Sequence, residues 1–477
     1  MKISPLYRYR YLRFLALLLL SGAVVGCNSL VEVDPPGTRP PPELIFQDDL
    51  TAVSAVRGMY SEMSSEPYFN NAGIGLLSSL SADDMRLLPP GMGISKDRRP
   101  FETNTIDPSN ALVKEYCWQP GYRSIYIANA ILEGLATSTG VSDTMKNQLR
   151  AEALFIRAFS NFYLTNLFGA IALPTSTDFD KNLHIGRTSP VEAYDAILND
   201  LLEAQLLFSN DKDFSFTKDD FPRSRASYWA ATALLARVYL YLEKWTEAEQ
   251  QATAVLDQTS LFALCADLDS VFLANSREVI WQLLPVVKEG RQSGPYDAQL
   301  FLEKVDGKPV IHFTKSFLEA IEPNDRRFSH WIETAVVHDT AYLYSNKYQQ
   351  PDGQDQFHIE LRLAELHLIR AEARAHQDNL LLAIDDVDML RSRANLSLLK
   401  DHSFTRDALL QKIAQERRIE LFAEGGHRWL DLKRTGNASI TLSSSDYKKW
   451  EDTDELYPVP QSEIVSNPNL GPQNHGY

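Results

Sequence analysis

Cysteine and positive charge are both scarce in this 477-residue chain. Its three cysteines are too few for a disulfide framework, and 47 Lys and Arg face 63 Asp and Glu, for a formal net charge of −16. Such an acidic balance argues against broad electrostatic binding to nucleic acid or to an anionic membrane surface. With 44% hydrophobic and 23% charged residues, the composition excludes a polytopic membrane protein, a collagen-like fibre and a fully disordered chain.

Motifs for catalysis and metal binding are missing as well. The chain has no GxSxG elbow, Walker loop or GxGxxG turn, and its ten histidines show neither HExxH nor a Cys/His zinc spacing. Asp83-Asp84 lacks the alternating acids and the glycine of an EF-hand loop, so we expect it to be a helix cap or a turn. The sequence therefore predicts no catalytic residues, no cofactor and no metal site of these kinds.

Residues 1–26 have the pattern of an export signal. Basic residues and no acid precede the apolar run Phe14–Leu20, which is shorter than the roughly 20 residues that span a bilayer. Small residues then lead directly to Cys27 and resemble a bacterial lipobox. This pattern predicts cleavage before Cys27 and lipidation of that cysteine. An ordinary secretory signal with a cysteine nearby by chance is the alternative.

Residues 27–47 are predicted to be a lipidated N-terminus and a tether. The Pro-rich stretch Asp34–Pro42 is typical of an extended spacer. Acylation of both the sulfur and the amine of Cys27 would suffice for stable anchoring in a membrane. Cys117 and Cys265 are most simply buried thiols, and a bridge between them is left open.

From Asp48 onward, the spacing of apolar residues is mostly helical. Apolar residues recur every three or four positions in segments that include Ala52–Met63 and Leu149–Phe168. The sequence Ser189-Pro190-Val191-Glu192 predicts a helix N-terminus with a capping box.

Residues 227–257 carry the alternation of small and large residues that is typical of a tetratricopeptide (TPR) helix pair. Leu235, Ala236 and Tyr239 precede a second set that begins at Ala248, and residues 361–393 repeat the pattern more loosely. The sequence therefore predicts a mainly α fold with about four TPR-like helix pairs. Loop-rich regions at about 66–120 and 258–355 would add a few short strands, for example at Val279–Leu284, and such loops often carry binding sites.

The C-terminal segment Glu416–Arg434 reads ERRIELFAEGGHRWLDLKR. It resembles the signature E-R-R-x-E-L-x-x-E-G-x-R-W-x-D-L-x-R of the SusD/RagB family of outer-membrane nutrient-binding lipoproteins. The departure from that pattern is the paired glycine followed by histidine at 425–427. The segments Tyr457–Ile464 and Asn467–Leu470 also fit the family, so with Cys27 the resemblance covers essentially the whole mature chain.

This resemblance implies one SusD-like domain over residues 48–477, anchored by lipid in the outer membrane and facing outside. Proteins of this family bind a nutrient and pass it to a SusC-like TonB-dependent transporter. The nutrient is an oligosaccharide or, in some members, a peptide, and the family has no chemistry of its own. Two alternatives stay open: a peptide ligand, and a lipid-anchored TPR scaffold that binds only protein partners.

Six residues of the signature are expected to be structural: Arg417, Glu420, Glu424, Arg428, Trp429 and Asp431. Arg417 falls in an apolar helical stripe, where a guanidinium is tolerated only if carboxylates meet it. We expect it to pair with Glu420, with Glu424 or with another helix. A glycosidase role for these glutamates is disfavoured, because adjacent helical turns give them similar environments and an acid/base pair needs different ones.

A sugar site needs aromatic faces and planar polar side chains. The two loop-rich regions offer Tyr68, Phe69, Asn70, Arg86, Tyr296, Trp331 and Tyr344 as candidate ligand residues, with Tyr342 beside the last. Because most single aromatic residues belong to cores, we expect roughly two or three of these residues to contact the ligand. The acidity of the chain disfavours polyanionic ligands, but a local cluster such as Arg98-Arg99 could overcome it.

Overall fold

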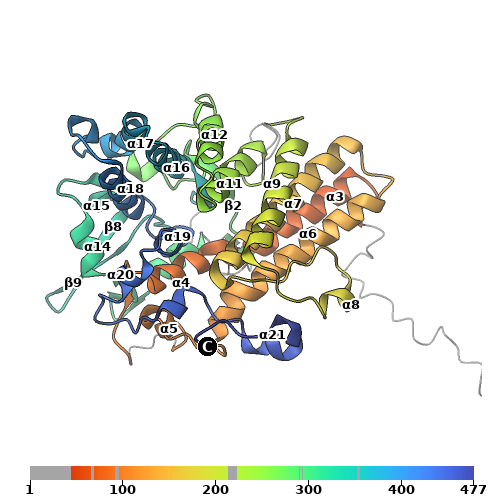
Figure 1. Cartoon of the computed structure of the whole chain (residues 1–477), viewed down its shortest axis with the longest axis horizontal. Helices are drawn as coiled ribbons and strands as arrows, with labels where there is room; N and C mark the ends of the chain where they lie inside the picture. Colours follow the sequence, from red (N-terminus) through yellow and green to blue (C-terminus); the bar gives the residue numbers. More distant parts are fainter. Residues whose placement is uncertain are drawn as a thin grey trace, which may run out of the picture. The chain divides into compact units, whose positions relative to one another are not determined.

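Helices make up most of the structure in Figure 1, a computed structural model that describes residues 45–65, 69–91, 96–212, 223–288, 291–292, 294–351 and 355–477. The predicted signal peptide, Cys27 and most of the predicted tether lie outside these residues. Residues Phe46–Tyr477 pack as one unit. The predicted mainly α fold class is confirmed.

The longer helices are α3 (Asp49–Met63), α6 (Gln119–Thr137), α7 (Asp143–Phe168), α9 (Pro190–Phe208), α11 (Tyr228–Tyr241), α12 (Trp245–Leu256), α16 (Leu363–His376), α17 (Leu380–Arg393) and α18 (Arg406–Glu420). The shorter helices are α4 (Ile74–Ser81), α5 (Arg99–Thr103), α8 (Phe179–Asn182), α13 (Tyr296–Phe301), α14 (Lys315–Ala320), α15 (Arg326–Trp331), α19 (His427–Arg434), α20 (Ala438–Leu442) and α21 (Gln461–Ser466).

Local sequence sets several of the helix ends. Ser189 caps α9 by accepting from the backbone N–H of Glu192, and the side chain of Glu192 accepts from the backbone N–H of Ser189, so the predicted capping box is present. Helix α7 ends at Gly169, whose φ of +73° is a conformation that favours glycine.

Tight turns join α6 to α7, α11 to α12 and α16 to α17, and the two helices of each pair pack together. Helix α9 packs on both α7 and α11, and α12 packs on α16, which also packs on α18, so the pairs form a continuous stack (Figure 1). The predicted core positions Leu235, Ala236 and Ala248 are all fully buried. The stack provides the rigid support on which the shorter elements lie.

The strands are short and pair in twos. They are β1 (Met85–Leu87), β2 (Val279–Leu283), β3 (Val287–Lys288), β4 (Arg291–Gln292), β5 (Lys304–Val305), β6 (Lys308–Pro309), β7 (Ile311–Phe313), β8 (Ile332–Val337), β9 (Thr340–Ser345) and β10 (His358–Arg362). The pairs are β1–β7, β2–β10, β3–β4, β5–β6 and β8–β9, all antiparallel. Strand β2 occupies the position predicted for a strand, and β10 leads directly into α16.

The region expected to be loop-rich near residues 66–120 contains more helix than the sequence suggested. Helix α4 is buried along its whole length. The π-helical turn η3 (Phe69–Gly73) directly precedes α4, and the π-helical turn η4 (Val113–Trp118) directly precedes α6. Cys117 and Cys265 are both free, so no bridge joins them. Within the described part of the chain, no helix combines the length and the hydrophobicity needed to cross a bilayer.

Candidate ligand-binding site

A row of side chains crosses three strands and includes the predicted residue Arg86. Arg86 on β1 lies opposite His312 on β7 in the antiparallel pairing. The His312 ring packs nearly perpendicular to Tyr342 on β9, with 5.5 Å between the ring centroids. On its other side, the guanidinium of Arg86 lies over the ring of Tyr447, 4.1 Å from the centroid. We call these four residues, Tyr447, Arg86, His312 and Tyr342, the Arg86 row.

The Arg86 row is accessible and polar. The side chain of Arg86 is 41% exposed, and the other three residues are half-buried. Arg86 donates from Nε to Glu102 at 3.2 Å, while its two terminal nitrogens bond to none of the described residues. Burial, followed by the charges of Arg86 and Arg99, lowers the pKa of His312 to about 4, so this imidazole is neutral at neutral pH. Aromatic faces, a neutral imidazole and a free guanidinium edge are groups that can hold a hydroxyl-rich ligand.

Of the four other predicted ligand residues whose side chains the structure describes, three are buried. Phe69, Trp331 and Tyr344 are 4%, 1% and 4% exposed, and their rings pack in the interior, so the structure does not offer their faces to a ligand. Trp331, for example, donates from Nε1 to the carbonyl of Leu268 at 3.0 Å. The half-buried Tyr296 donates its hydroxyl to the carbonyl of Ser65 at 3.1 Å.

Tyr68 and the side chain of Asn70 lie outside the described residues, so their predicted role stays a prediction. The sequence did not single out His312 or Tyr447. His312 lies in a three-residue strand and Tyr447 in an irregular segment, so neither had a periodic pattern that could reveal its neighbours. Tyr342 was suggested only as one of the aromatic residues of the second loop-rich region.

The SusD/RagB-like signature, by contrast, is buried in the junction between helices. Arg417 on α18 donates from Nε to Asp431 on α19 at 2.8 Å, so it pairs with another helix and not with Glu420 or Glu424. Trp429 is fully buried and stacks on Tyr457, with ring centroids 6.0 Å apart. These contacts hold α18, α19 and the C-terminal segment together.

Glu420 and Glu424 accept bonds from cations on distant segments. The carboxylate of Glu420, which is fully buried, binds Arg362 at 2.7 Å and Arg327 at 2.9 Å, and it also accepts from Arg393. Glu424 accepts from Arg362 and from Lys347, each at 2.6 Å. Isolated buried charges are very costly, so this mutual pairing is what allows them to stay inside.

A second set of ion pairs joins the signature to the N-terminal third of the described chain. Arg418 donates to Asp84 and to Asp83, each at 2.8 Å, and Arg428 donates to Asp83 at 2.8 Å. Both aspartates are buried. The pair lies in the turn between α4 and β1, as the prediction of a cap or a turn allowed, and it also binds the signature arginines.

The paired glycines of the signature form the turn between α18 and α19. Gly425 and Gly426 have φ values of +47° and +72°, in the left-handed region. A Cβ on Gly426 would lie 2.9 Å from Oγ of Ser78 on α4, a distance shorter than Cβ atoms adopt to non-bonded atoms in real structures. The turn therefore needs glycine for its conformation and for its contact with α4.

Several cavities of the described residues lie outside the Arg86 row. One of about 700 Å³ is bounded by α11, α16, α18, α19 and α20, and ion-paired side chains such as Glu372, Asp431 and Arg434 line it. A groove of about 360 Å³ beside α6 and α8 is lined by Trp118, Tyr126 and other residues. The side chains of the larger cavity are mostly engaged with one another, so we do not take it as the ligand site.

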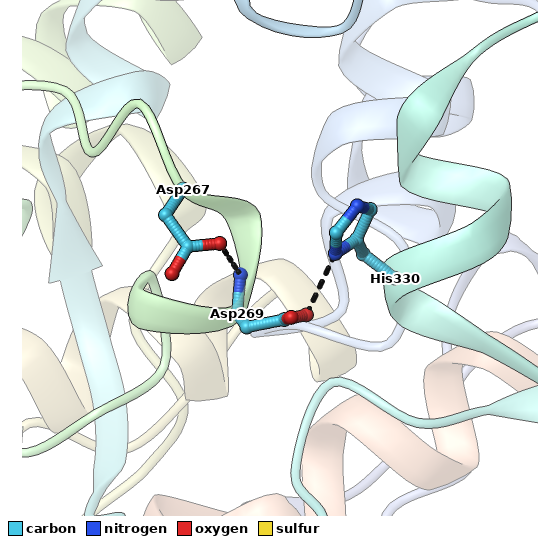
Figure 2. Close-up of side chains that lie close together, drawn as sticks. All are labelled: Asp267, Asp269 and His330. Carbon is cyan, nitrogen blue, oxygen red and sulfur yellow. Dashed lines mark hydrogen bonds and ion pairs between the residues drawn. The ribbon is translucent and has the colours of Figure 1, made fainter.

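Figure 2 shows Asp267, Asp269 and His330, whose ligand atoms lie within 4.8 Å of one another. Nδ1 of His330 lies 2.8 Å from Oδ1 of Asp269, and Asp267 accepts from the backbone N–H of Asp269 (Figure 2). Both carboxylates are exposed, and the hydrogen bonds within the group account for its geometry. The group does not by itself define a metal site.

The helical stack with its buried signature defines a helical-repeat scaffold that carries loops and short strands. Residues 97–240 match the family model described as "Starch-binding associating with outer membrane", and residues 323–477 match the one described as "SusD family". The chain belongs to the SusD/RagB family.

Relatives span nearly all of the chain. SusD-like protein P2 of Formosa agariphila is 27% identical and covers 97% of this chain and 99% of its own. The starch-binding protein SusD of Bacteroides thetaiotaomicron is 26% identical over 72% of this chain and 75% of its own. Surface glycan-binding protein A from Bacteroides fluxus superposes with a TM-score of 0.73 at 22% identity, covering 90% of this chain and 99% of that one, a likeness of fold. These last two relatives are named as binding proteins.

Proposed function

We propose that this protein is a lipid-anchored outer-membrane protein that binds a nutrient oligosaccharide at the Arg86 row and delivers it to a SusC-like TonB-dependent transporter. The observation that carries the proposal is the row itself, in which the rings of Tyr342 and Tyr447 lie on either side of His312 and Arg86. A sugar ring can stack on an aromatic face while its hydroxyls bond to planar polar groups.

Membership of the SusD/RagB family supports the nutrient-binding part of this proposal, as do relatives named for starch or glycan binding. The lipid anchor at Cys27 and the outward orientation rest on the sequence pattern of the N-terminus and on the family. The description of one matching family model as associating with the outer membrane agrees with that location.

Calorimetric titration with a panel of oligosaccharides and peptides tests the ligand class. A chain that starts at residue 28 keeps all of Phe46–Tyr477, the part that packs as one unit. We expect heat from binding of an oligosaccharide, with no product formed. Tyr342→Ala and Tyr447→Ala should each weaken binding by about three- to tenfold, because each removes one stacking face.

Tyr126→Ala is the matched control, since Tyr126 is a 55% exposed tyrosine outside the row. Equal losses in all three variants would contradict the proposed position of the site, and binding of peptides alone would contradict the ligand class.

Purification of the full-length lipidated protein from its own membranes tests the partner: we expect a barrel transporter to accompany it. Purification of the protein alone would contradict the delivery step.

A further inference from the structure

The Arg86 row carries an excess of positive charge in an otherwise acidic protein. Arg86 and Arg99 share a single carboxylate, that of Glu102: one oxygen of Glu102 accepts from Arg86 and the other from Arg99. The side chain of Glu102 is 1% exposed, whereas that of Arg86 is 41% exposed. The unbalanced charge therefore lies at the exposed end of the cluster, on Arg86.

The next carboxylates along the chain do not cancel this charge. Asp83 and Asp84 lie close enough to Tyr447 to influence its hydroxyl, but they are buried and already paired with Arg418 and Arg428. Among these described groups, four guanidiniums thus face three carboxylates.

A further cation stands near the other end of the row. The ammonium of Lys304 lies 4.9 Å from the ring centroid of Tyr344, which is two residues from Tyr342 on β9. Side chains two residues apart on a strand project from the same face. Lys304 therefore adds a positive charge near the Tyr342 end of the row.

Arg86 is also prepared to bind an anion by its geometry. One face of its guanidinium is covered by Tyr447, and Nε is held by Glu102. The two terminal nitrogens bond to none of the described residues, and they form the edge with which arginine grips a carboxylate or a sulfate through two parallel hydrogen bonds. Because these contacts restrict the side chain, less conformational entropy is lost when a ligand binds.

We infer that the Arg86 row selects acidic oligosaccharides, with a carboxylate or sulfate group of the ligand bound to Arg86 and an adjacent sugar ring stacked on Tyr342 or Tyr447. This inference rests on the proposed function, since it names the class of glycan that the same site takes. The net charge of −16 repels polyanions from the protein as a whole, so the selectivity must come from this local cluster.

The test is titration of the chain from residue 28 onward with three oligosaccharides of equal length: a neutral one, a uronate and a sulfate ester. We expect at least one acidic oligosaccharide to bind about tenfold tighter than the neutral one, and its affinity to fall as NaCl rises from about 50 to 500 mM. The uronate and sulfate arms distinguish the two sources of negative charge.

Arg86→Gln should lower the affinity for the acidic ligand by about tenfold more than it lowers the affinity for the neutral one. Asp446→Asn is the control, because it changes the net charge by one unit at an exposed position next to Tyr447. The change is opposite in sign to that of Arg86→Gln, so it should not lower the affinity for the acidic ligand. Equal binding of acidic and neutral oligosaccharides, or equal losses for both in Arg86→Gln, would overturn the inference and leave glycan binding in place. If no oligosaccharide of either kind binds, the proposed function itself fails.

Discussion

Replacing Glu420 with Gln removes a buried negative charge and keeps the size of the side chain. The carboxylate binds Arg362, Arg327 and Arg393 and has no exposed surface. Burial alone would raise the pKa of Glu420, but the charges of Arg393, Arg362 and Arg327 outweigh it and hold this pKa well below its usual range. In the variant, three guanidiniums lose a shared partner and cannot reach water.

Breaking a buried ion pair costs about 3–5 kcal/mol, a large part of the ~5–15 kcal/mol by which proteins are stable. At about 2.1 cal/mol/K per residue, the unit Phe46–Tyr477 has an unfolding entropy of about 0.9 kcal/mol/K. The substitution should therefore lower the melting temperature by about 3–6 °C, and urea unfolding should show a lower midpoint with an unchanged slope.

Differential scanning calorimetry on Glu420→Gln and on the control variant Glu319→Gln measures how far each substitution lowers the melting temperature. Glu319 pairs with Lys315 at 3.4 Å, but both side chains are well exposed, at 66% and 88%, so its replacement should cost less than about 0.5 kcal/mol. If the two variants melt within about 1 °C of each other, the buried network does not contribute what its geometry implies, and the reasoning is refuted.

Three further predictions concern pH, the signature turn and the anchor. A carboxylate whose pKa is lowered by folding contributes stability above its unfolded pKa of about 4.3, so the free energy of unfolding should fall as the pH drops below that value. This fall should be less steep in Glu420→Gln. Urea unfolding measured from pH 3 to 7 would contradict the prediction if the free energy of unfolding depended equally on pH in both proteins. Gly426→Ala should destabilise the protein by about 1–3 kcal/mol in urea unfolding, because the new Cβ is strained and meets Ser78, whereas Gly58→Ala, with open space inside α3, should be neutral or stabilising; similar effects would exclude this explanation. Cys27→Ala should release the full-length protein from sedimented membranes, and continued sedimentation would count against lipidation.

The longer helices and their ends could be predicted because their signals are local. The Ser189–Glu192 cap and the apolar periodicity of α7 lie within single segments of the chain. Helix α4 could not be predicted in this way, because it has eight residues that are all buried and so no polar face to give a period. Short buried helices are set by the elements around them.

The candidate site was harder to predict than the fold. Arg86 was suggested because it follows Tyr68, Phe69 and Asn70 in the first loop-rich region. Whether an aromatic residue is accessible depends on what packs over it. Trp331 and Tyr342 lie only eleven residues apart in the chain, yet Trp331 is buried and Tyr342 is half-buried. Likewise, the need of Arg417 for a carboxylate is evident from its apolar stripe, whereas the choice of Asp431 follows from how α19 packs.

The pairing of Asp83 and Asp84 with Arg418 and Arg428 has a consequence for the order in which the protein is made. The aspartates are synthesised early and their cations near the end of the chain, so the two buried carboxylates have no counter-charge until almost all residues are available. A shortened chain that stops before α18 would lack the cations that pair with the turn between α4 and β1. We expect such a chain to be more sensitive to proteolysis in that region. Full pairing of these two carboxylates therefore requires residues from both ends of the described unit.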